Sequence, residues 1–365
     1  MAGRLRRCRE LWGDCVLSEA PPRLRTVADA AVLPRPEGGF GIYAQGVRID
    51  GPEETVPDGL PHETAPDVPH LFVDPIVPHY GHLVTDTLAR LWPLAGWQGP
   101  RPKLLSLAPW PEAGGEAAAA ILGRLGLARA DVVVADRPMR LPHLVVADPA
   151  FRERSLVHRA FGDLCRTIGR DLWREDEVDA VARPVYLSKS RLAAGISRIA
   201  NEEAIVAELD RLGVEIVFPE TLPFGEQVRL FSTRRVVMGS TGSAFHTAAF
   251  AAPGRRILGL NWMRRLHANF ALLDAIGGHT ARYYFPLGTR YAQAEAFHFG
   301  WTVRDPRGVA TELVERAHAF EALDARDAAE EAAERTALGR AMGFATALRG
   351  RISRHLRRGA RRPAE

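Results

Sequence analysis

The chain has 365 residues, of which 46% are hydrophobic and 25% are charged. This is the composition of a soluble globular protein, and it excludes a disordered or collagen-like chain. The length favours two domains. No apolar run approaches the roughly 18 residues that span a bilayer, and the first residues lack the apolar region of a signal peptide, so we expect a cytoplasmic protein.

The cysteines and the net charge indicate the cellular compartment and the kind of partner to expect. Cys8, Cys15 and Cys165 are odd in number and lack the spacing of a zinc site, which favours a reducing compartment without disulfide bonds. The net charge of +4 comes mainly from arginines near the C-terminal end, so we expect no nucleic-acid partner. Lysine occurs only at Lys103 and Lys189, and arginine is the usual cation.

The first 70 residues are rich in proline and glycine and predict an irregular lead-in with short extended pieces. From residue 71 onward, predicted strands alternate with predicted helices. We expect strands at 71–73, 103–107 and 131–135, and helices at 81–97 and 114–125. This alternation indicates a mainly parallel sheet with right-handed crossovers.

A long amphipathic stretch at 152–174 is predicted to join this block to a second one. In the second block we expect strands at 185–187, 214–218, 235–238 and 256–260, and helices at 201–212, 224–231 and 243–250. The pattern therefore predicts two Rossmann-type β/α/β domains, at 71–175 and 176–305, that face a cleft. A helical tail is expected at 306–365.

A turn of small residues follows the strand at 235–238 and opens the next helix. It consists of Gly239, Ser240, Thr241, Gly242 and Ser243. Glycines let the backbone approach an anion closely, and the free N–H groups of a helix start favour a phosphate. The glycine spacing fits neither the dinucleotide fingerprint nor the P-loop, so an ordinary strand–helix turn is the alternative.

A polar cluster follows the strand at 185–187, with Ser188 at its start and Arg191 and Arg198 further along. Cations just beyond a strand end can neutralise a departing diphosphate, which a transferase needs if no metal does it. The alternative for both arginines is a solvated loop. Asn201 is either a ligand-binding residue or the N-cap of the following helix.

His82, Asp86 and Arg90 recur at i+4 and are predicted to project from one face of the helix at 81–97. A His–Asp pair at this spacing is suited to a general base that removes a proton from a hydroxyl. The alternative is a surface ion pair. A metal site is less favoured, because no third ligand stands at a supporting spacing.

Two carboxylates complete the candidate set. Glu220 follows the strand at 214–218, where folds of this kind often hold ribose or sugar hydroxyls. Glu226 stands in the first turn of the helix at 224–231, where a carboxylate also stabilises the helix by itself.

From about residue 78 to residue 260 the chain resembles the family 61 glycosyltransferases, whose bacterial members include capsular polysaccharide biosynthesis proteins. In the first block, residues 80–92 look like that family's helix of the form Y-G-H, D-x-L-x-R-L-W. In the second block the resemblance is carried by an ordered series of motifs: Ser188-Lys189-Ser190-Arg191, the segments 198–202, 212–217 and 224–228, Pro219-Glu220, the Gly239 turn and Pro253-Gly254.

The resemblance implies a GT-B-like fold, a nucleotide-sugar donor, inversion at the anomeric carbon, and no obligatory metal or other cofactor. In this interpretation the region of His82 and Asp86 helps to deprotonate a glycan or lipid-linked acceptor, and the polar residues of the second block hold the donor. Many relatives carry a histidine within the glycine-rich turn, whereas this chain has Thr241 in the turn and His246 further on. Thr241 can hydrogen-bond a phosphate but cannot act as a base.

Two other functions stay open at this point. One is a non-catalytic glycan-binding or assembly subunit that keeps the scaffold, which the missing turn histidine favours. The other is a different polysaccharide-modifying enzyme on a similar frame, such as a pyruvyl transferase. Turnover of a nucleotide sugar separates the first interpretation from both.

The C-terminal end predicts a basic amphipathic helix. Phe344, Leu348, Ile352 and Leu356 recur at i+4 among many arginines in residues 340–365. Such a helix is suited to an anionic membrane surface and would hold the protein on the inner face of the membrane. A solvated tail, or a helix packed back on the first domain, is the alternative. Nothing in the sequence indicates the donor sugar, the acceptor or the oligomeric state.

Overall fold

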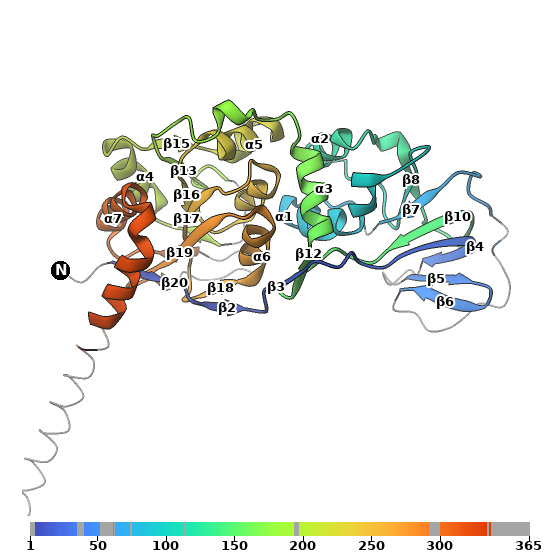
Figure 1. Cartoon of the computed structure of the whole chain (residues 1–365), viewed down its shortest axis with the longest axis horizontal. Helices are drawn as coiled ribbons and strands as arrows, with labels where there is room; N and C mark the ends of the chain where they lie inside the picture. Colours follow the sequence, from blue (N-terminus) through green and yellow to red (C-terminus); the bar gives the residue numbers. More distant parts are fainter. Residues whose placement is uncertain are drawn as a thin grey trace, which may run out of the picture.

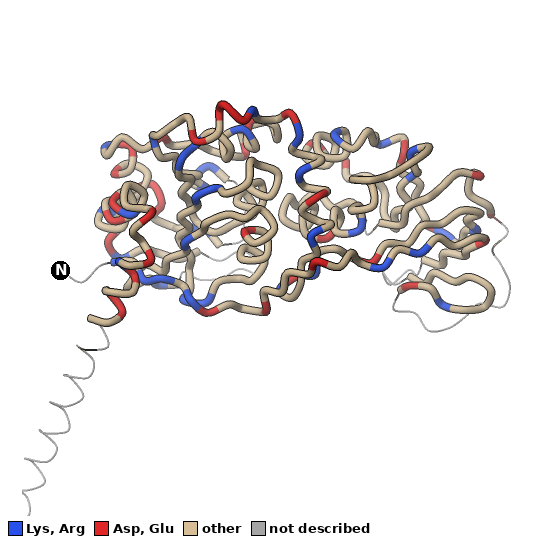
Figure 2. Tube along the Cα trace, in the orientation of Figure 1, with Lys and Arg blue, Asp and Glu red and all other residues tan. Residues whose placement is uncertain are grey.

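The computed structural model describes residues 4–34, 40–51, 61, 63–73, 75–112, 114–192, 197–291, 300–333 and 336. The fold is mixed α/β, with two large sheets in two blocks that lie side by side (Figure 1). Basic and acidic residues are interspersed over both blocks (Figure 2).

The C-terminal block is built on a six-stranded sheet whose strands are parallel except for one at the edge. In sheet order the strands are β1 (Leu5–Arg7), β19 (Thr280–Pro286), β17 (Arg256–Leu260), β16 (Val237–Ser240), β13 (Val185–Leu187) and β15 (Glu215–Val217). β1 is the antiparallel strand. The four strands predicted from the sequence for this block are confirmed, whereas β1 and β19 were not anticipated.

Helices cover both faces of this sheet, as a parallel sheet requires. Alternate residues of β13, β16 and β17 pack on opposite faces, so the strands are buried on both sides. One face packs on α4 (Glu202–Arg211) and α7 (Pro306–His318). The other packs on α5 (Phe224–Thr233), the 3-10 helix η7 (Ser243–Phe250) and α6 (Ala268–Gly277).

The N-terminal block has a seven-stranded sheet that is only partly parallel. In sheet order its strands are β6 (Val47–Asp50), β5 (Phe40–Ala44), β4 (Leu24–Pro34), β10 (Met139–Ala147), β7 (His70–Phe72), β8 (Lys103–Ser106) and β9 (Val132–Val134). β10, β7, β8 and β9 run parallel, and β4 to β6 add an antiparallel half. α2 (Glu116–Arg124) follows β8, as predicted.

The first 50 residues differ from the irregular lead-in that their composition predicts. They contribute β1 to the C-terminal sheet and β4 to β6 to the N-terminal sheet. Between these, β2 (Glu10–Trp12) pairs with β18 (Arg265–His267), and β3 (Val16–Ser18) pairs with β12 (Leu156–His158), which in turn pairs with β11 (Phe151–Arg152). The N-terminal strand segment therefore runs along both blocks (Figure 1).

The single helix predicted at 81–97 is replaced by four short helical pieces. These are α1 (Tyr80–His82), the π-helix η1 (Leu83–Thr87), and the 3-10 helices η2 (Leu88–Arg90) and η3 (Trp92–Gly96). Pro93 has no N–H group and cannot donate a helical hydrogen bond. The buried Arg90 side chain donates to the Ala147 carbonyl at 2.7 Å, which ties this segment to β10. Tertiary contacts thus outweigh the local helical pattern.

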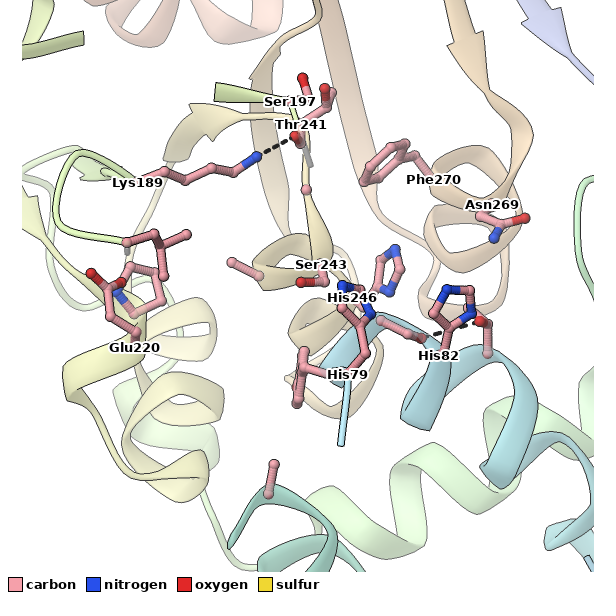
Figure 3. A pocket seen from close by; sticks show the side chains of 18 of the residues that line it. His79, His82, Lys189, Ser197, Glu220, Thr241, Ser243, His246, Asn269 and Phe270 are labelled. Atoms are coloured by element: carbon pink, nitrogen blue, oxygen red, sulfur yellow. Dashed lines mark hydrogen bonds between the residues drawn. The ribbon is translucent and has the colours of Figure 1, made fainter. Parts of the chain in front are cut away.

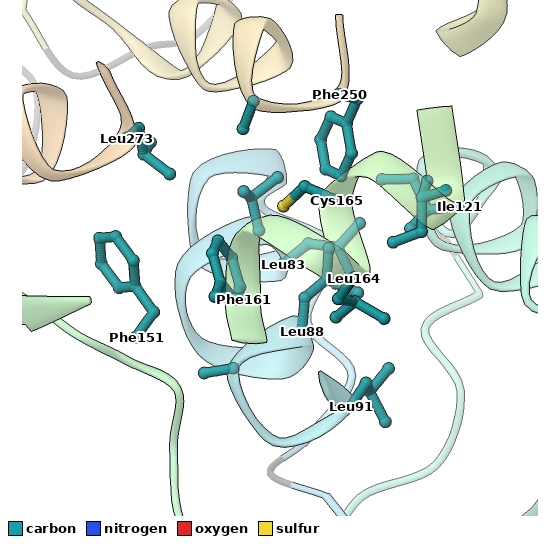
Figure 4. Packing of buried hydrophobic residues seen from close by; sticks show 14 of the residues in the cluster. Leu83, Leu88, Leu91, Ile121, Phe151, Phe161, Leu164, Cys165, Phe250 and Leu273 are labelled. Carbon is teal, nitrogen blue, oxygen red and sulfur yellow. The ribbon is translucent and has the colours of Figure 1, made fainter. Parts of the chain in front are cut away.

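The two blocks share a continuous hydrophobic core (Figure 4). α3 (Arg159–Gly169), which lies within the predicted connector, packs between them and buries Phe161, Leu164 and Cys165. Its last residue, Gly169, approaches η7 so closely that a Cβ there would lie 1.9 Å from the Phe250 carbonyl oxygen. Tyr80 of α1 also hydrogen-bonds Thr247 of η7 at 2.8 Å.

The C-terminal helices pack on the same block. After α7, the 3-10 helix η8 (Phe320–Ala322) and helical residues 323–333 follow. The fully buried Arg316 pairs with Glu312, Asp327 and Glu330, and its guanidinium lies 4.4 Å from the Tyr284 ring centre. The predicted helical tail is helical up to residue 333, and residues 340–365, with their predicted membrane helix, lie outside the described residues.

The remaining short elements connect these parts. They are η4 (Arg129–Asp131), η5 (Glu175–Glu177), β14 (Arg198–Ile199), η6 (Pro219–Thr221), β20 (Arg290–Tyr291) and β21 (Gly300–Thr302). β14, β21 and β20 form a small separate sheet.

Candidate functional site

A cavity of about 1190 Å³ lies where the two blocks meet. Its walls come from the carboxyl ends of β13, β15, β16 and β17, from α1, and from the N-terminal strand segment (Figure 3). Of the residues singled out by the sequence, the cavity brings together Ser188, Glu220, Thr241, Gly242, Ser243 and His82.

The position of the cavity follows from the order of the strands. Counted along the chain, the parallel strands β13, β15, β16, β17 and β19 lie in the order 2-1-3-4-5. The crossovers leave β13 toward one edge and β16 toward the other, so a crevice opens between their carboxyl ends. Ligands of open α/β sheets bind at this switch point, and the turns after β13 and β16 line the cavity.

Lys189 lies at this switch point, although it was not among the site residues predicted from the sequence. It follows β13, and its Nζ donates to the Thr241 carbonyl at 2.6 Å, which joins the two turns. Burial lowers the pKa of Lys189 to about 8, so the ammonium keeps most of its charge at neutral pH. The sequence does contain a sign of its importance. Lysine is rare in this chain, and one of only two lysines lies two residues after the predicted strand at 185–187.

A buried carboxylate holds the Lys189 turn. Glu202, at the start of α4, accepts hydrogen bonds from the Tyr186 hydroxyl at 2.9 Å and from the Lys189 backbone N–H at 3.1 Å. Burial raises the pKa of Glu202, although these bonds and the nearby cations oppose the shift. Glu202 therefore positions the Lys189 backbone.

The small-residue turn is shaped by Lys189 and Asn261. A Cβ on Gly242 would lie 2.3 Å from Lys189 Nζ, so glycine makes room for the ammonium. The Thr241 hydroxyl donates to Asn261 Oδ1 at 2.9 Å and is therefore not free to donate to a phosphate. Behind the turn, Gly239 and Ser240 are buried within β16, and a Cβ on Gly239 would lie 3.0 Å from the Leu187 carbonyl oxygen.

The predicted histidine–carboxylate pair is formed on the opposite wall. His82 Nδ1 lies 2.8 Å from Asp86 Oδ2, and Thr85 Oγ1 lies 2.8 Å from the other carboxylate oxygen. Both side chains of the pair are about half exposed, at 53% and 45%. His79 stacks beside His82 with ring centres 5.0 Å apart, and burial together with His82 lowers its pKa.

His246, which lies beyond the turn in the sequence, lines the cavity. It is 7% exposed, and burial, assisted by His267 and His79, lowers its pKa to about 3. Its Nδ1 has no hydrogen-bond partner among the residues that the structure describes. A neutral imidazole of this kind can hydrogen-bond a ligand, but it is a poor proton acceptor at neutral pH.

Besides Asp86, Gly239 and Ser240, four more candidates do not line the cavity, namely Arg191, Arg198, Asn201 and Glu226. Arg191 is exposed, and its guanidinium stacks 3.8 Å from the Phe218 ring centre. Arg198 belongs to β14. Asn201 occupies the N-cap position of α4, yet its amide bonds both backbone groups of Val303 at 2.8 and 3.0 Å.

Glu226 is exposed in the first turn of α5, which is the structural alternative given for it. Among the described residues, no three His, Cys, Asp or Glu side chains are grouped to hold a metal ion. In the same part of the chain, no helix combines the length and the apolar character needed to cross a membrane.

One of two comparisons with known proteins gives a match. A sequence comparison finds no match among curated proteins. The family model described as glycosyltransferase 61 matches residues 80–258. This span contains α1 with His82 and the turns after β13, β15 and β16, so it covers most of the cavity wall. Residues 80–258 therefore form a glycosyltransferase family 61 domain, and the protein is a glycosyltransferase.

Proposed function

We propose that this enzyme transfers a sugar from a nucleotide-sugar donor to a hydroxyl of a glycan or lipid-linked acceptor, with inversion, in the synthesis of capsular, extracellular or other surface polysaccharides. One observation carries the proposal. The same cavity holds a lysine at the phosphate-binding position of a parallel sheet and, on its other wall, a histidine that a carboxylate orients. Leaving-group stabilisation and proton removal are the two tasks of an inverting transfer.

The donor is assigned an orientation along the sheet edge. Glu220 follows β15, the strand after β13 in the chain, which is where such sheets hold ribose hydroxyls. The diphosphate then lies at the switch point, against the Lys189 ammonium and the backbone N–H groups of Gly242 and Ser243. This places the anomeric carbon toward α1 and His82.

The chemical step follows from these positions. The acceptor oxygen attacks the anomeric carbon and forms the new glycosidic bond while the bond from that carbon to the diphosphate oxygen breaks. The departing diphosphate keeps the electron pair, and Lys189 stabilises its charge. His82 takes the acceptor proton on Nε2, because its Nδ1 is held by Asp86.

Lys189 takes the role that the sequence assigned to Arg191 and Arg198. One of its three N–H groups donates to Thr241, and we assign the others to phosphate oxygens. The partly buried Lys189 ammonium can neutralise a diphosphate directly, so we propose that no metal ion is required. We further propose that the two blocks form a GT-B-like arrangement, which the position of the cavity at their junction supports.

A thermal-shift titration with nucleotides and nucleotide sugars tests the donor site. A nucleoside diphosphate at about 100 times its Kd should stabilise the protein by about 2.7 kcal/mol, because it binds only the folded state. Lys189→Ala should weaken this stabilisation, and Arg198→Ala should leave it unchanged. Stabilisation by no nucleotide, or one lost only in Arg198→Ala, would reject the site.

For residues 340–365 we propose binding to the inner face of the cytoplasmic membrane, which would hold the enzyme near a lipid-linked acceptor. The support is the basic amphipathic pattern, in which each cation near an anionic surface adds about 1 kcal/mol. The full chain should pellet with anionic vesicles but not with neutral ones, and salt should release it. A variant without residues 340–365 should stay in the supernatant and keep its nucleotide binding; equal recovery of both in the supernatant would contradict the proposal.

A further inference from the structure

The cavity extends past η7 into a second part that the donor does not use. Its walls come from β2, from the turn after β17, and from the start of α6, and its residues include Trp12, Trp262, Phe270, Glu153 and Arg265. In Figure 3, Lys189 and Glu220 lie on one side of the cavity, Phe270 and Asn269 lie on the other, and Ser243, His79 and His246 lie between them. We call this second part the aromatic subsite.

Trp12 stands at the mouth of the aromatic subsite and is held in place. β2 pairs with β18 in the register that sets Trp12 beside His267, and the two rings meet edge to face with centres 5.2 Å apart. The Arg154 guanidinium lies 5.0 Å from the indole centre. The side chain is nevertheless 41% exposed, so the fold fixes a large apolar surface next to solvent instead of burying it.

The turn after β17 is fixed in a similar way. The Asn261 amide donates to the carbonyls of Met263 and Arg265 at 2.8 and 2.9 Å, which sets the course of the backbone through Trp262. The Trp262 ring meets the Tyr291 ring edge to face, with centres 5.8 Å apart. A second indole therefore lines the cavity on a rigid turn.

Polar groups lie beside these rings. His267 Nδ1 accepts from the Asn269 backbone N–H at 3.4 Å, so a neutral His267 carries its proton on Nε2 and donates to Glu153 at 3.3 Å. The Glu153 carboxylate keeps further acceptor positions, and Arg265 supplies exposed donors. Rigid aromatic surface with a few convergent polar groups is the composition of a small-molecule site.

This combination matches the chemistry of a pyranose ring. A sugar presents C–H groups on one face, which pack on an indole, and hydroxyls around its rim, which bond carboxylates and guanidinium groups. We propose that the aromatic subsite binds a sugar unit of the acceptor. The assignment rests on the proposed function, because the donor diphosphate is placed at Lys189 and the proposed base, His82, lines the same cavity.

Glycan binding by the full-length protein tests the proposal. The fluorescently labelled protein, with a saturating stabilising nucleotide or none, is applied to an array of immobilised oligosaccharides of mixed composition. We expect retention on a subset of glycans and at least about a tenfold loss in Trp12→Ala, equal to about 1.4 kcal/mol. Trp12→Phe, which keeps an aromatic face, should recover most of the binding. Trp97→Ala is the control, because Trp97 is a partly exposed tryptophan outside the cavity that bonds the Pro100 carbonyl.

The outcomes separate this subsite from the donor site. Nucleotide stabilisation should be the same in Trp12→Ala and in the wild type, which also shows that the variant is folded. If the wild type is stabilised by nucleotide but binds no glycan, or if Trp12→Ala binds glycans as well as the wild type does, the aromatic subsite is wrong and the donor site stands. If glycan binding depends on Trp12 but no nucleotide stabilises the protein, the subsite stands and the proposed function fails.

Discussion

The two walls of the cavity are built by different means. On the C-terminal side the wall residues that we assign to the donor lie within three residues of the ends of strands of one parallel sheet, as Lys189 does after β13 and Thr241 after β16. On the opposite side His82 comes from a short helical piece and Trp12 from a strand that pairs far along the chain. The first wall is a product of sheet topology and the second of tertiary pairing.

This difference shows which site residues can be predicted from their positions in the sequence. A parallel sheet gathers the residues after its strands at one edge, so their positions in the sequence suffice to bring them together. No such rule gathers the second wall, which depends on the contacts between α1 and η7 and between β2 and β18. Variants on the two walls should accordingly fail in different ways.

The largest effect is expected from removing the cation of the donor wall. Lys189→Ala should lower turnover by about 100-fold to 1000-fold, the range for a lost group that stabilises transition-state charge. Steady-state kinetics with the nucleotide sugar found by thermal shift measures this. Lys103→Ala is the control, because the only other lysine pairs with Asp131 in the N-terminal block. Equal losses in both variants would remove Lys189 from the mechanism.

The pH dependence of kcat/KM also tests the role of Lys189. The pKa of Lys189 is lowered to about 8 by burial, so its positive charge is present below that pH and is lost as the pH rises through it. The value of kcat/KM, which reports the free enzyme, should therefore fall above about pH 8. In Lys189→Arg the fall should move to higher pH, because a guanidinium stays charged. An unmoved profile in that variant would assign the titration to another group.

The second largest effect is expected on the opposite wall. His82→Ala should reduce turnover by about 100-fold while leaving nucleotide affinity unchanged, because the imidazole acts on the acceptor hydroxyl. Asp86→Asn should have a smaller effect of the same kind, because it changes only the group that orients Nδ1. If His82→Ala keeps its turnover and is folded, Asp86 becomes the candidate base.

A smaller effect is expected on the contact that joins the two blocks. Gly169→Ala puts a methyl group against the Phe250 carbonyl, so α3 and η7 must separate, which should destabilise the protein by about 1–3 kcal/mol. Denaturant unfolding measures the change. Gly123→Ala in α2 is the matched control, because among the described residues the added methyl meets no atom within 4 Å beyond its chain neighbours and its own helix backbone, and it should stabilise the helix by up to about 1 kcal/mol. Similar results for both glycines would mean that the blocks are not tightly coupled.

The smallest effect is expected from the turn hydroxyl. Thr241→Val removes the donor to Asn261 and should cost about 1 kcal/mol of unfolding free energy, with nucleotide affinity changed by less than about threefold. Thr311→Val is the control, since its exposed hydroxyl bonds only a carbonyl of its own helix among the described residues. A large loss of nucleotide affinity in Thr241→Val would show that the hydroxyl turns toward the phosphate when the donor binds.

Local patterns in the sequence determined the C-terminal block. The strands β13, β15 and β16 lie close to where apolar runs predict them, and the turns that follow these strands carry Ser188, Glu220 and Thr241 into the cavity. A run of buried residues between turn signals is a local property, so it survives without knowledge of the rest of the chain. The His82–Asp86 contact was also within reach, because an i+4 spacing is local.

Only the tertiary structure decided the rest. Lys189 is distinguished by its bond to Thr241, 52 positions away, and Trp12 by the pairing of β2 with β18. The break-up of the predicted helix at 81–97 and the strands of the first 50 residues also depend on partners distant in sequence. Such contacts are selected by the packing of the whole chain, which residue spacing along one segment does not encode.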